Sequence, residues 1–566
     1  MQATPWLQHY SQAIPHRIQT AKQVSFVDVL EESFDKFRAL PMYESMDKVL
    51  TYEKVDKLTS RFSAYLQHHT PLKPGDHIAI QIPNLLQYPV AMLGTLRAGM
   101  VAVNVNPLYT PHEMAHQLKD AAVKGIVILA NFAYKLEKIL HQTAIQSIIV
   151  TEVGDLLGGV KQQWVNFAVK RLKGWVPRFN LPQAIPFRHV LQKDVSAKVH
   201  PGRVKPNHTA LLQYTGGTTG VSKGAVLTHA NILANVEQMC AFMAGRLAVG
   251  KETFITPLPL YHIFSLTVNM LAGIKLGAKN VLIANPRDLV ALIREMRKHP
   301  FSMITGVNIL FSKLLKKKQF AKLDFSTLKL ALAGGVALQP AVAQEWEHIT
   351  GKPLIEGYGL TEASPVVSCN LVHKAPQLGT VGVPLPSTTV RIVDNAGAEV
   401  ATDQPGNLWV KGPQVMQGYW LKKEETRDVL HKGWLKTGDI AVLQSDGYLK
   451  IIDRKKEMIN ISGFNVYPSE IEAVMTAHPG IEEACAVGVI EADGQEAVRL
   501  FLVRKDSSLT AQEVIHYGKQ QLVSYKIPKY VEFRDQLPKS QVGKVLKRVL
   551  KEESMQNLAA LHASQS

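Results

Sequence analysis

The sequence predicts a protein of the α/β class, with a large N-terminal domain of two stacked α/β units plus a small β-barrel-like unit, followed by a small α+β C-terminal domain. Apolar runs of strand length alternate with helical patterns over most of the chain before Gly379, which is typical of helices layered on largely parallel sheets. From about Gly379 the pattern changes to short strands joined by tight turns. The 566 residues exceed what one hydrophobic core supports, roughly 250 to 300 residues, so at least two domains are expected.

The two α/β units are expected from apolar strands that alternate with helices. In chain order, these strands are predicted at residues 77–84, 100–106, 125–131, 147–152, 328–335 and 352–359. Helices are predicted at 85–98 and 339–351, each directly after a strand.

The small β unit is expected from four short strands with alternating patterns. They are predicted at residues 388–394, 406–412, 439–444 and 448–453. Asp446-Gly447 lies between the last two, and Asp-Gly between alternating strands is a strong hairpin signal. The charged stretch 453–458 then suits a domain boundary. The remaining α+β domain is expected from a helix at 468–480 and strands at 484–490 and 497–503.

The composition limits the classes of partner. A net charge of +17 favours anions such as nucleotides, phosphorylated cofactors, nucleic acid or an acidic membrane surface. Lys and Arg are scattered rather than gathered with aromatic residues, so no nucleic-acid partner is expected, although a basic nucleic-acid-binding protein is the rival hypothesis from another class. The three cysteines form no CxxC pair, which argues against disulfides and zinc. Without a secretory signal or a window of roughly 18 apolar residues, a soluble or peripheral cytoplasmic protein is expected.

The segment TGGTTGVSKG, residues 215–224, is predicted to bind phosphate. It lies between two expected strands, and its lysine does not directly follow the last glycine, so it differs from a Walker loop, which opens into a helix. Glycines let backbone N–H groups face a common concavity that holds anions. A flexible linker is the alternative, but linkers seldom lie between apolar strands. The residues expected to contact phosphate are Thr215, Gly216, Gly217, Thr218, Thr219, Gly220 and Lys223.

Six motifs in order resemble the acyl-adenylate-forming superfamily of AMP-binding enzymes, and within it the bacterial long-chain fatty acid:CoA ligases. The motifs are YTGGTTGVSKGA (214–225), PLPLYHIF (257–264), EGYGLTEASP (356–365), GWLKTGDI (433–440), DRKKEMINISGFNVYPSEIE (453–472) and PKSQVGKVLKR (538–548). The resemblance implies that a fatty carboxylate attacks the α-phosphate of ATP and releases pyrophosphate, and that CoA then displaces AMP to form a thioester. It also implies Mg²⁺ as cofactor, with ATP and CoA as co-substrates. Transfer to a carrier-protein thiol instead of CoA is the alternative.

The resemblance assigns roles in the nucleotide site. Glu362 is implied as a catalytic carboxylate and the Mg²⁺ ligand, since this hard cation favours one or two carboxylates with phosphate oxygens; the alternative is an acid stabilised by a helix N-terminus. Asp439 is implied to accept both ribose hydroxyls. Arg454 is implied to reach the nucleotide; without the family it would be a linker charge. The residues implied to border adenine and the α-phosphate are Gly335, Tyr358, Gly359 and Thr361.

Two further catalytic residues are implied by the same resemblance. Lys544 is implied to contact the α-phosphate and the attacking carboxylate, whereas a lone lysine in a basic segment is otherwise a solvated surface residue. His262 is implied to lie beside the substrate carboxylate, whereas a histidine in an apolar run is more often a core residue. Residues 305–307 are expected to border an acyl channel, since burying a long alkyl chain is worth about 0.8 kcal/mol per CH₂.

The resemblance also implies a mobile C-terminal domain. Residues 1–453 would form the N-terminal AMP-binding (adenylation) domain, 454–458 the hinge and 459–566 the C-terminal mobile domain. Lys456 falls at the hinge position, where a few backbone torsions absorb the swing; an exposed linker lysine is the alternative. After the swing, Gly463 and Phe464 would line the CoA tunnel.

One segment suggests contact with a membrane. Residues 160–179 place apolar side chains and two tryptophans at helical spacing up to Val176, among basic residues, which fits an interfacial helix at the inner face of the cytoplasmic membrane. A core-packing helix explains the pattern equally well. The oligomeric state stays open, with a homodimer as one expectation.

Overall fold

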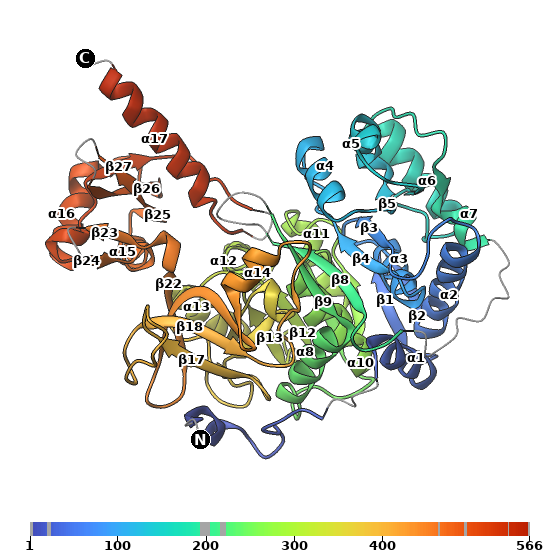
Figure 1. The fold of residues 1–566 in the computed structure, drawn as a ribbon, viewed down its shortest axis with the longest axis horizontal. Helices are drawn as coiled ribbons and strands as arrows, with labels where there is room; N and C mark the ends of the chain where they lie inside the picture. The colour runs from blue at the N-terminus through green and yellow to red at the C-terminus, as the bar shows by residue number, and fades with distance from the viewer. Residues whose placement is uncertain are drawn as a thin grey trace.

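The computed structural model describes residues 4–19, 24–192, 204–215, 222–461, 464–491, 495–540 and 543–563. It confirms the predicted α/β class: two large sheets with helices form most of the chain, and a small α+β domain ends it (Figure 1). Within these ranges, no helix has the length and apolar character needed to cross a membrane.

The first large sheet has eight strands, and it is parallel except at one edge. In spatial order its strands are β19 (Gly418–Tyr419), β9 (Gly224–Thr228), β8 (Thr209–Tyr214), β4 (Val101–Asn104), β3 (His77–Gln81), β5 (Gly125–Leu129), β6 (Ser147–Thr151) and β7 (Ile185–Pro186). The antiparallel pair β8–β9 flanks the predicted phosphate loop, so the strand–loop–strand context is confirmed.

The second large sheet has nine strands with a parallel centre and antiparallel edges. In spatial order its strands are β16 (Val383–Pro384), β15 (Val366–Cys369), β14 (Leu354–Gly359), β13 (Leu330–Ala333), β12 (Met303–Gly306), β10 (Thr253–Thr256), β11 (Lys279–Leu282), β1 (Pro41–Ser45) and β2 (Lys48–Thr51). The segment 253–359 supplies most of the parallel strands, and the early hairpin β1–β2 completes one edge.

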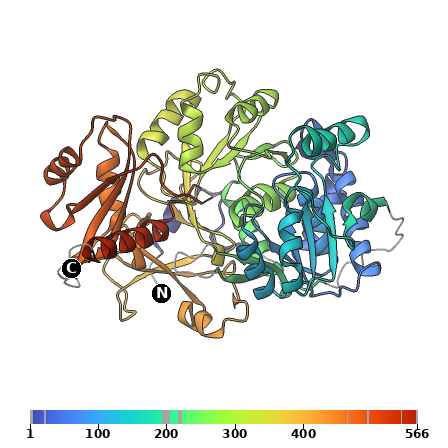
Figure 2. The same cartoon turned by 90° about the horizontal axis from the view of Figure 1, so that it is seen from above.

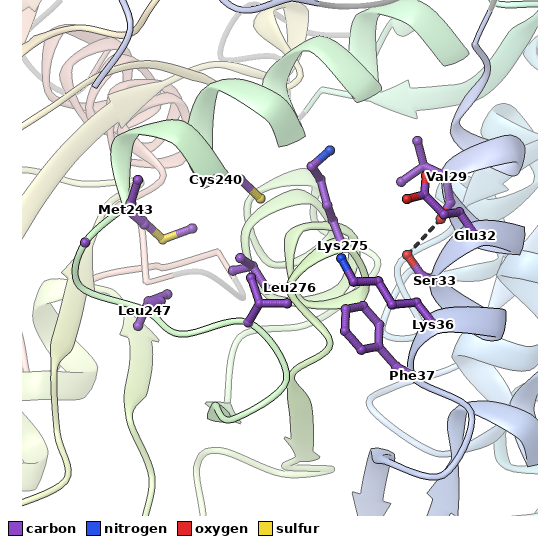
Figure 3. Close-up of a pocket in the computed structure, with 13 residues that line it drawn as sticks. Val29, Glu32, Ser33, Lys36, Phe37, Cys240, Met243, Leu247, Lys275 and Leu276 are labelled. Atoms are coloured by element: carbon purple, nitrogen blue, oxygen red, sulfur yellow. Dashed lines mark hydrogen bonds between the residues drawn. The ribbon is translucent and has the colours of Figure 1, made fainter. Parts of the chain in front are cut away.

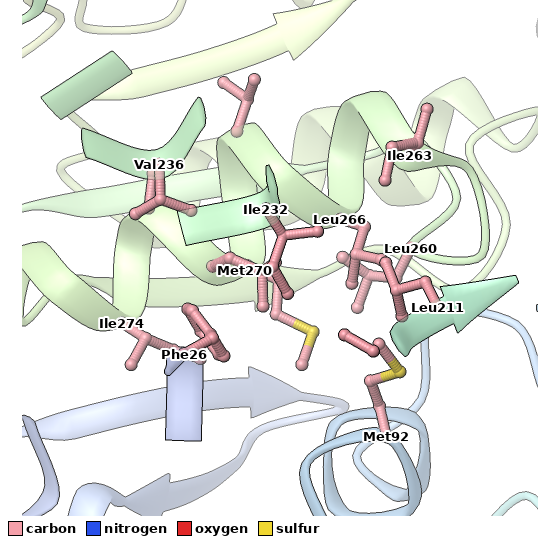
Figure 4. Close-up of a cluster of buried hydrophobic side chains, with 14 of the residues drawn as sticks. Phe26, Met92, Leu211, Ile232, Val236, Leu260, Ile263, Leu266, Met270 and Ile274 are labelled. Atoms are coloured by element: carbon pink, nitrogen blue, oxygen red, sulfur yellow. The ribbon is translucent and has the colours of Figure 1, made fainter. Parts of the chain in front are cut away.

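Helices pack between and around the two sheets. The helices of the large domain are α1 (Phe26–Lys36), α2 (Tyr52–His68), α3 (Gln87–Arg97), α4 (Pro111–Asp120), α5 (Ala133–Ile139), α6 (Gly159–Phe167), α7 (Phe187–Gln192), α8 (His229–Phe242), α9 (Ile263–Ser265), α10 (Ala272–Leu276), α11 (Leu289–Lys298), α12 (Asn308–Leu315), α13 (Pro340–Thr350) and α14 (Lys423–Val429). Buried side chains of α3, α8 and the π-helix η5 (Leu266–Leu271) meet strand β8 in one cluster, whose members include Met92, Leu211, Ile232 and Met270 (Figure 4). This cluster joins the two α/β units into one core.

Capping fixes where α8 begins, directly after the strand that follows the phosphate loop. The Thr228 side chain accepts a hydrogen bond from the Asn231 N–H, and the Asn231 side chain accepts one from the Thr228 N–H. This reciprocal capping box satisfies two N–H groups that the first helical turn leaves unpaired. The helix therefore begins only after β9 has ended, unlike the helix of a Walker loop.

The antiparallel unit and the small domain follow in the predicted order. The unit contains β17 (Thr389–Val393), β18 (Gly406–Lys411), β21 (Trp434–Leu443), β20 (Leu430–His431) and β22 (Leu449–Arg454). The small domain contains β23 (Ile459–Ile461), β24 (Phe464–Val466), α15 (Pro468–Thr476), β25 (Ile481–Ile490), β26 (Glu496–Arg504), α16 (Ala511–Gln521), β27 (Tyr530–Phe533) and α17 (Lys547–Ala563). A second view shows it at one end of the molecule, opposite the first α/β unit (Figure 2).

One element ends earlier than predicted. The segment 160–179 forms α6 and a short π-helix η4 (Ala168–Leu172), and Gly174, at φ +62°, follows the end of the helical segment. Trp175 and Val176 therefore lie beyond the helix rather than on it. The left-handed region that Gly174 adopts favours glycine and stops a helix.

Candidate functional site

Asp439 is the buried centre of a polar cluster that joins three of the predicted segments. Asp439 and Arg454 stand opposite each other across β21 and β22, and the Arg454 Nε lies 3.0 Å from an Asp439 carboxylate oxygen. From the end of β14, the Tyr358 hydroxyl donates to the other carboxylate oxygen at 2.5 Å. Burial and the Asp439 charge raise the pKa of Tyr358, so the hydroxyl stays protonated. Each carboxylate oxygen has a second lone pair, so it can accept one further hydrogen bond.

Glu362 lies near the mouth of the predicted phosphate loop. It is part of the short 3₁₀ turn η6 (Thr361–Ala363), and its carboxylate accepts a hydrogen bond of 2.7 Å from the Tyr419 hydroxyl. The Lys223 ammonium lies 5.4 Å from the centroid of the same Tyr419 ring, and the Thr215 N–H donates to the Lys223 carbonyl. The two ends of the loop are therefore held together beside Glu362. The loop residues Gly216, Gly217, Thr218, Thr219 and Gly220 lie outside the described residues.

Gly335 belongs to a tight loop between β13 and α13. Its φ of +81° is a conformation that favours glycine, and a side chain there would contact Val307. The loop is held in place by the Glu356 carboxylate, which accepts the Leu338 N–H at 2.9 Å. Burial raises the pKa of Glu356 to about 7. Since Glu356 is two residues before Tyr358 on β14, this bond fixes the Gly335 loop relative to the Tyr358 segment.

Gly359 has a packing reason for being glycine. A Cβ at this position would lie 2.3 Å from the Pro365 carbonyl oxygen, so the backbone of the YGLTE segment approaches Pro365 too closely for any side chain. Packing alone therefore requires glycine at this position, in addition to the nucleotide-binding role that the resemblance implies.

Lys544 enters the site from the small domain. It follows Gly543, which adopts φ +75° and lies so close to the large domain that an added Cβ would meet the Ile309 side chain at 2.7 Å. A second link between the domains joins Lys316 to Glu482 at 2.8 Å. Burial, reinforced by the Arg454 charge, lowers the pKa of Lys544 to about 8, while Glu457 and Asp439 oppose the shift. The lysine and the Asp439 cluster thus share one electrostatic environment, although their segments are about a hundred residues apart.

This environment predicts a pH dependence for any step that needs the Lys544 charge. An ordinary lysine stays charged up to a pKa of about 10.4. Because the pKa of Lys544 is lowered to about 8, the ammonium is present below pH 8 and is lost as the pH rises through that value. The kcat/KM for pyrophosphate release should therefore fall above pH 8, whereas K544R, whose guanidinium stays charged, should show no such fall. A wild-type profile that is flat to pH 10 would contradict this assignment.

His262 is half-buried at the start of α9. Its Nδ1 accepts the Phe264 N–H at 3.4 Å, which leaves the other ring nitrogen to carry the proton. Burial lowers the pKa of His262 to about 4, so the ring is neutral near pH 7. The Phe264 ring, in turn, lies against Gly334 of the Gly335 loop. His262 therefore lies near that loop as an uncharged group.

The predicted hinge residue Lys456 interacts electrostatically with the Asp439 cluster, whereas the predicted CoA residue Phe464 lies on the surface of the small domain. Lys456 is in a short 3₁₀ turn, η7 (Lys455–Glu457), where burial and the Arg454 charge lower its pKa. The adjacent Glu457 pairs with Lys547 at 3.5 Å. Phe464 is 55% exposed on the small domain and stacks on Tyr525. Gly463 lies outside the described residues.

The sequence interpretation missed two side chains of this site. Tyr419 is 57 residues from Glu362, and no local spacing relates the two. Glu356 could have been found, because an acid inside an apolar strand is rarely buried without a partner. The structure brings together Tyr358, Asp439, Arg454 and Lys544, and it links Glu362 to Lys223 through Tyr419.

Glu356 is expected to position the Gly335 loop. E356L would leave the Leu338 N–H buried without an acceptor, which costs at least about 1 kcal/mol, so the KM for ATP should rise about fivefold or more at little change in kcat. E356Q keeps an acceptor oxygen and should keep the KM within about twofold.

The raised pKa of Glu356 predicts that the thermal stability of E356Q differs from that of the wild type in a pH-dependent way. The pKa of Glu356 is about 7 in the folded chain and lower in the unfolded one, so its burial costs stability as the pH rises from about 4.5 to 7. E356Q should therefore gain Tm over the wild type at pH 8 but not at pH 5. An unchanged KM in E356L together with a lowered Tm would show a purely structural role.

A cavity of about 370 Å³ lies elsewhere, between α1 and the ends of α8 and α10 (Figure 3). Its walls include Phe37, Cys240, Leu247 and Leu276, with Lys36 and Lys275 also present. None of its lining residues is a predicted site residue. Burial raises the pKa of the Cys240 thiol to about 12, so this thiol stays protonated near neutral pH.

The two-domain fold and a polar site to which both domains contribute define a class of nucleotide-binding enzyme, and comparisons with known proteins identify it. The family model described as AMP-binding enzyme matches residues 30–420, and the one described as AMP-binding enzyme C-terminal domain matches residues 470–544. The chain belongs to this family of AMP-binding enzymes.

Similar proteins cover nearly the whole chain. The long-chain-fatty-acid–CoA ligase of Escherichia coli O6:H1 is 50% identical over 97% of this chain and 98% of its own. The enzyme of the same name from Bacillus subtilis is 36% identical over 98% of both chains. The structure of ATP-bound MatB from Rhodopseudomonas palustris has a TM-score of 0.81 at 26% identity and covers 94% of this chain and 100% of its own. The anthranilate CoA ligase AuaEII, at 20% identity and a TM-score of 0.84 over 96% of this chain and 99% of its own, shares the fold.

Proposed function

We propose that this protein is a long-chain fatty acid:CoA ligase, which uses ATP to activate a fatty acid and then transfers the acyl group to CoA for fatty acid degradation and lipid metabolism. The observation that carries the proposal is that Lys544, from the small domain, shares a buried site with Tyr358, Asp439 and Arg454 of the large domain. The substrate class is supported by the 50% identity to a long-chain-fatty-acid–CoA ligase over nearly the full length of both chains.

The first half-reaction would be adenylation. A carboxylate oxygen of the fatty acid attacks the α-phosphorus of ATP, the bond from that phosphorus to the bridging oxygen breaks, and pyrophosphate leaves. Such phosphoryl chemistry depends on positioning and on neutralising charge at the phosphate oxygens. Asp439 would hold the ribose hydroxyls. The adenine and the α-phosphate would be flanked by the Gly335 loop, Tyr358, Gly359 and Thr361. Arg454 and Lys544 would supply the positive charge. Neutral His262 would lie beside the substrate carboxylate.

Thr215, Lys223 and the loop between them would hold the β- and γ-phosphates. Glu362 fits Mg²⁺, because this cation binds one or two carboxylates together with phosphate oxygens and water, and Tyr419 links the Glu362 carboxylate to Lys223 at the end of that loop. The ion would supply charge neutralisation on those oxygens. Tyr419 would then fix the direction of the Glu362 carboxylate through its hydrogen bond.

The second half-reaction would need a different pose of the small domain. The CoA sulfur attacks the acyl carbonyl and loses its proton, the bond from that carbon to the phosphate oxygen breaks, and AMP leaves. We propose that residues 454–458 are the hinge between domains 1–453 and 459–566, with Lys456 at the pivot. Rotation there would withdraw Lys544 and bring Gly463 and Phe464 to line the CoA tunnel. The exposed position of Phe464 in the present pose is consistent with such a movement.

AMP release from ATP and Mg²⁺ with fatty acids from octanoate to oleate, with and without CoA, tests the proposal. We expect release that depends on both CoA and a long-chain acid. AMP release without CoA dependence would favour the carrier-protein alternative. A specific mobility shift with nucleic acid at physiological salt would favour the other rival, and none is expected. The cytoplasmic location and the homodimer stay predictions, which cell fractionation and size-exclusion chromatography with light scattering can test.

A further inference from the structure

The segment 159–178 presents an apolar face that the protein core does not cover. Its large side chains are mostly exposed: Val160 is 79% exposed, Trp164 61%, Phe167 56%, Leu172 64% and Trp175 58%. Val160, Trp164 and Phe167 are spaced by four and three residues, so they share one side of α6. We name these five residues, which lie on α6, on η4 and just after Gly174, the α6 face. Their exposure shows that these five side chains do not pack in the core, although other apolar residues of the segment do.

The opposite side of α6 holds the helix to the body of the domain. The Asn166 side chain accepts the Gly154 N–H at 2.7 Å and donates to Asp155 at 3.2 Å. Ala168 is 7% exposed, and Val165 packs against the main core. Lys161 pairs with Asp47 at 3.2 Å. The α6 face is therefore held in a fixed orientation, directed away from the protein.

The charged side chains of the segment itself have a single sign. No acidic residue occurs between Asp155 and Asp194, whereas basic ones are frequent. The lysines and arginines of residues 156–192 are Lys161, Lys170, Arg171, Lys173, Arg178 and Arg188. Lys161 and Arg188 pair with acids, but in the part of the chain that the structure describes no acid pairs with the other four, all of which are exposed. The Lys173 ammonium lies 4.2 Å from the centroid of the Trp175 ring.

We propose that the α6 face docks on an anionic lipid bilayer, with its aromatic and aliphatic side chains in the headgroup region and Lys170, Arg171, Lys173 and Arg178 on lipid phosphates. Exposed tryptophans among unpaired cations match such an interface, because amphipathic rings settle at headgroup depth and cations meet the negative surface. A nucleic-acid groove would not require the exposed Val160, Phe167 and Leu172.

The position of the face suits the proposed function, on which this inference rests, because long-chain fatty acids partition into bilayers. The α6 helix and the small domain lie at opposite ends of the molecule (Figures 1 and 2). Docking through α6 would therefore leave the small domain free to swing.

Co-sedimentation of the full chain with vesicles tests the proposal. The wild type should bind vesicles of phosphatidylglycerol and phosphatidylcholine at least tenfold more tightly than vesicles of phosphatidylcholine alone. The triple variant K170E/R171E/K173E and the double variant W164S/W175S should each lose most of this binding, and the second should also lose the blue shift of tryptophan fluorescence. The matched control K317E/K318E/K322E makes the same charge change at exposed lysines elsewhere and should bind as the wild type does.

Three outcomes would overturn the docking proposal: no preference of the wild type for anionic vesicles, full binding by the α6 variants, or equal loss in the control. Activity on oleate dispersed in neutral detergent should stay within twofold in every variant, which shows that they fold. Vesicle binding requires no turnover, so a failed ligase assay with intact binding would reject the proposed function alone.

Discussion

K544A should slow adenylation by about a hundredfold to a thousandfold, the usual effect of removing one group that stabilises developing charge. Conversion of supplied oleoyl-AMP and CoA to oleoyl-CoA should stay within about threefold of the wild type. The reason is that Lys544 shares the environment of Asp439 and Arg454 in this structure, where its turn packs against Ile309, and would leave it when the proposed hinge rotates. Pyrophosphate release with oleate and no CoA measures the first step, and thioester formation from the adenylate measures the second.

A nearby lysine serves as the control for this experiment. Lys551 lies on α17 of the same domain and is not part of the Asp439 cluster, so K551A should leave both steps within about twofold of the wild type. Equal loss of the two steps in K544A would contradict the assignment, because it would show a general loss of structure or a lysine needed in both poses.

Many of the strands were predictable because their chemistry is local. Strand β5 is apolar at every position, strand β3 is apolar between its two ends, and both are buried throughout. The hairpin of β21 and β22 also follows from a local signal, the Asp446-Gly447 turn, but a β-bulge between Ile440 and Ala441 shifts the register, so the pairing of Asp439 with Arg454 could not be read from that turn. The end of the helical segment at Leu172 was missed because apolar spacing continued past Gly174, whose backbone conformation no periodicity records.

The candidate site was less accessible to sequence reasoning because its contacts cross long distances in the chain. Tyr358 reaches Asp439 across 81 residues and Tyr419 reaches Glu362 across 57, and only the packing of separate sheets brings them together. Motif resemblance supplied Asp439, Glu362 and Lys544. It did not identify Tyr419 or Glu356, which position other parts of the site through hydrogen bonds to Glu362 and to the Leu338 N–H.

G543A should reduce adenylation about fivefold to 150-fold while affecting the thioester step much less. Two costs act at this position. The φ of +75° penalises any side chain and therefore lowers stability; a turn that keeps this φ during the proposed swing would carry the same penalty in both poses. The collision with Ile309, at 2.7 Å, exists only while the turn is docked, and overpacking of this kind costs about 1 to 3 kcal/mol. The docked pose, which the first step requires, should therefore lose population.

Two further variants separate these costs. Gly351 also has a left-handed φ, +66°, but open space around its Cβ position, so G351A should lower Tm and leave both half-reactions nearly unchanged. I309A removes the side chain that the methyl group added by G543A would strike, so the double variant G543A/I309A should recover most of the adenylation rate that G543A loses. If the double variant were no faster than G543A, the loss would come from backbone strain in the turn, and contact between the turn and Ile309 would not select the adenylating pose.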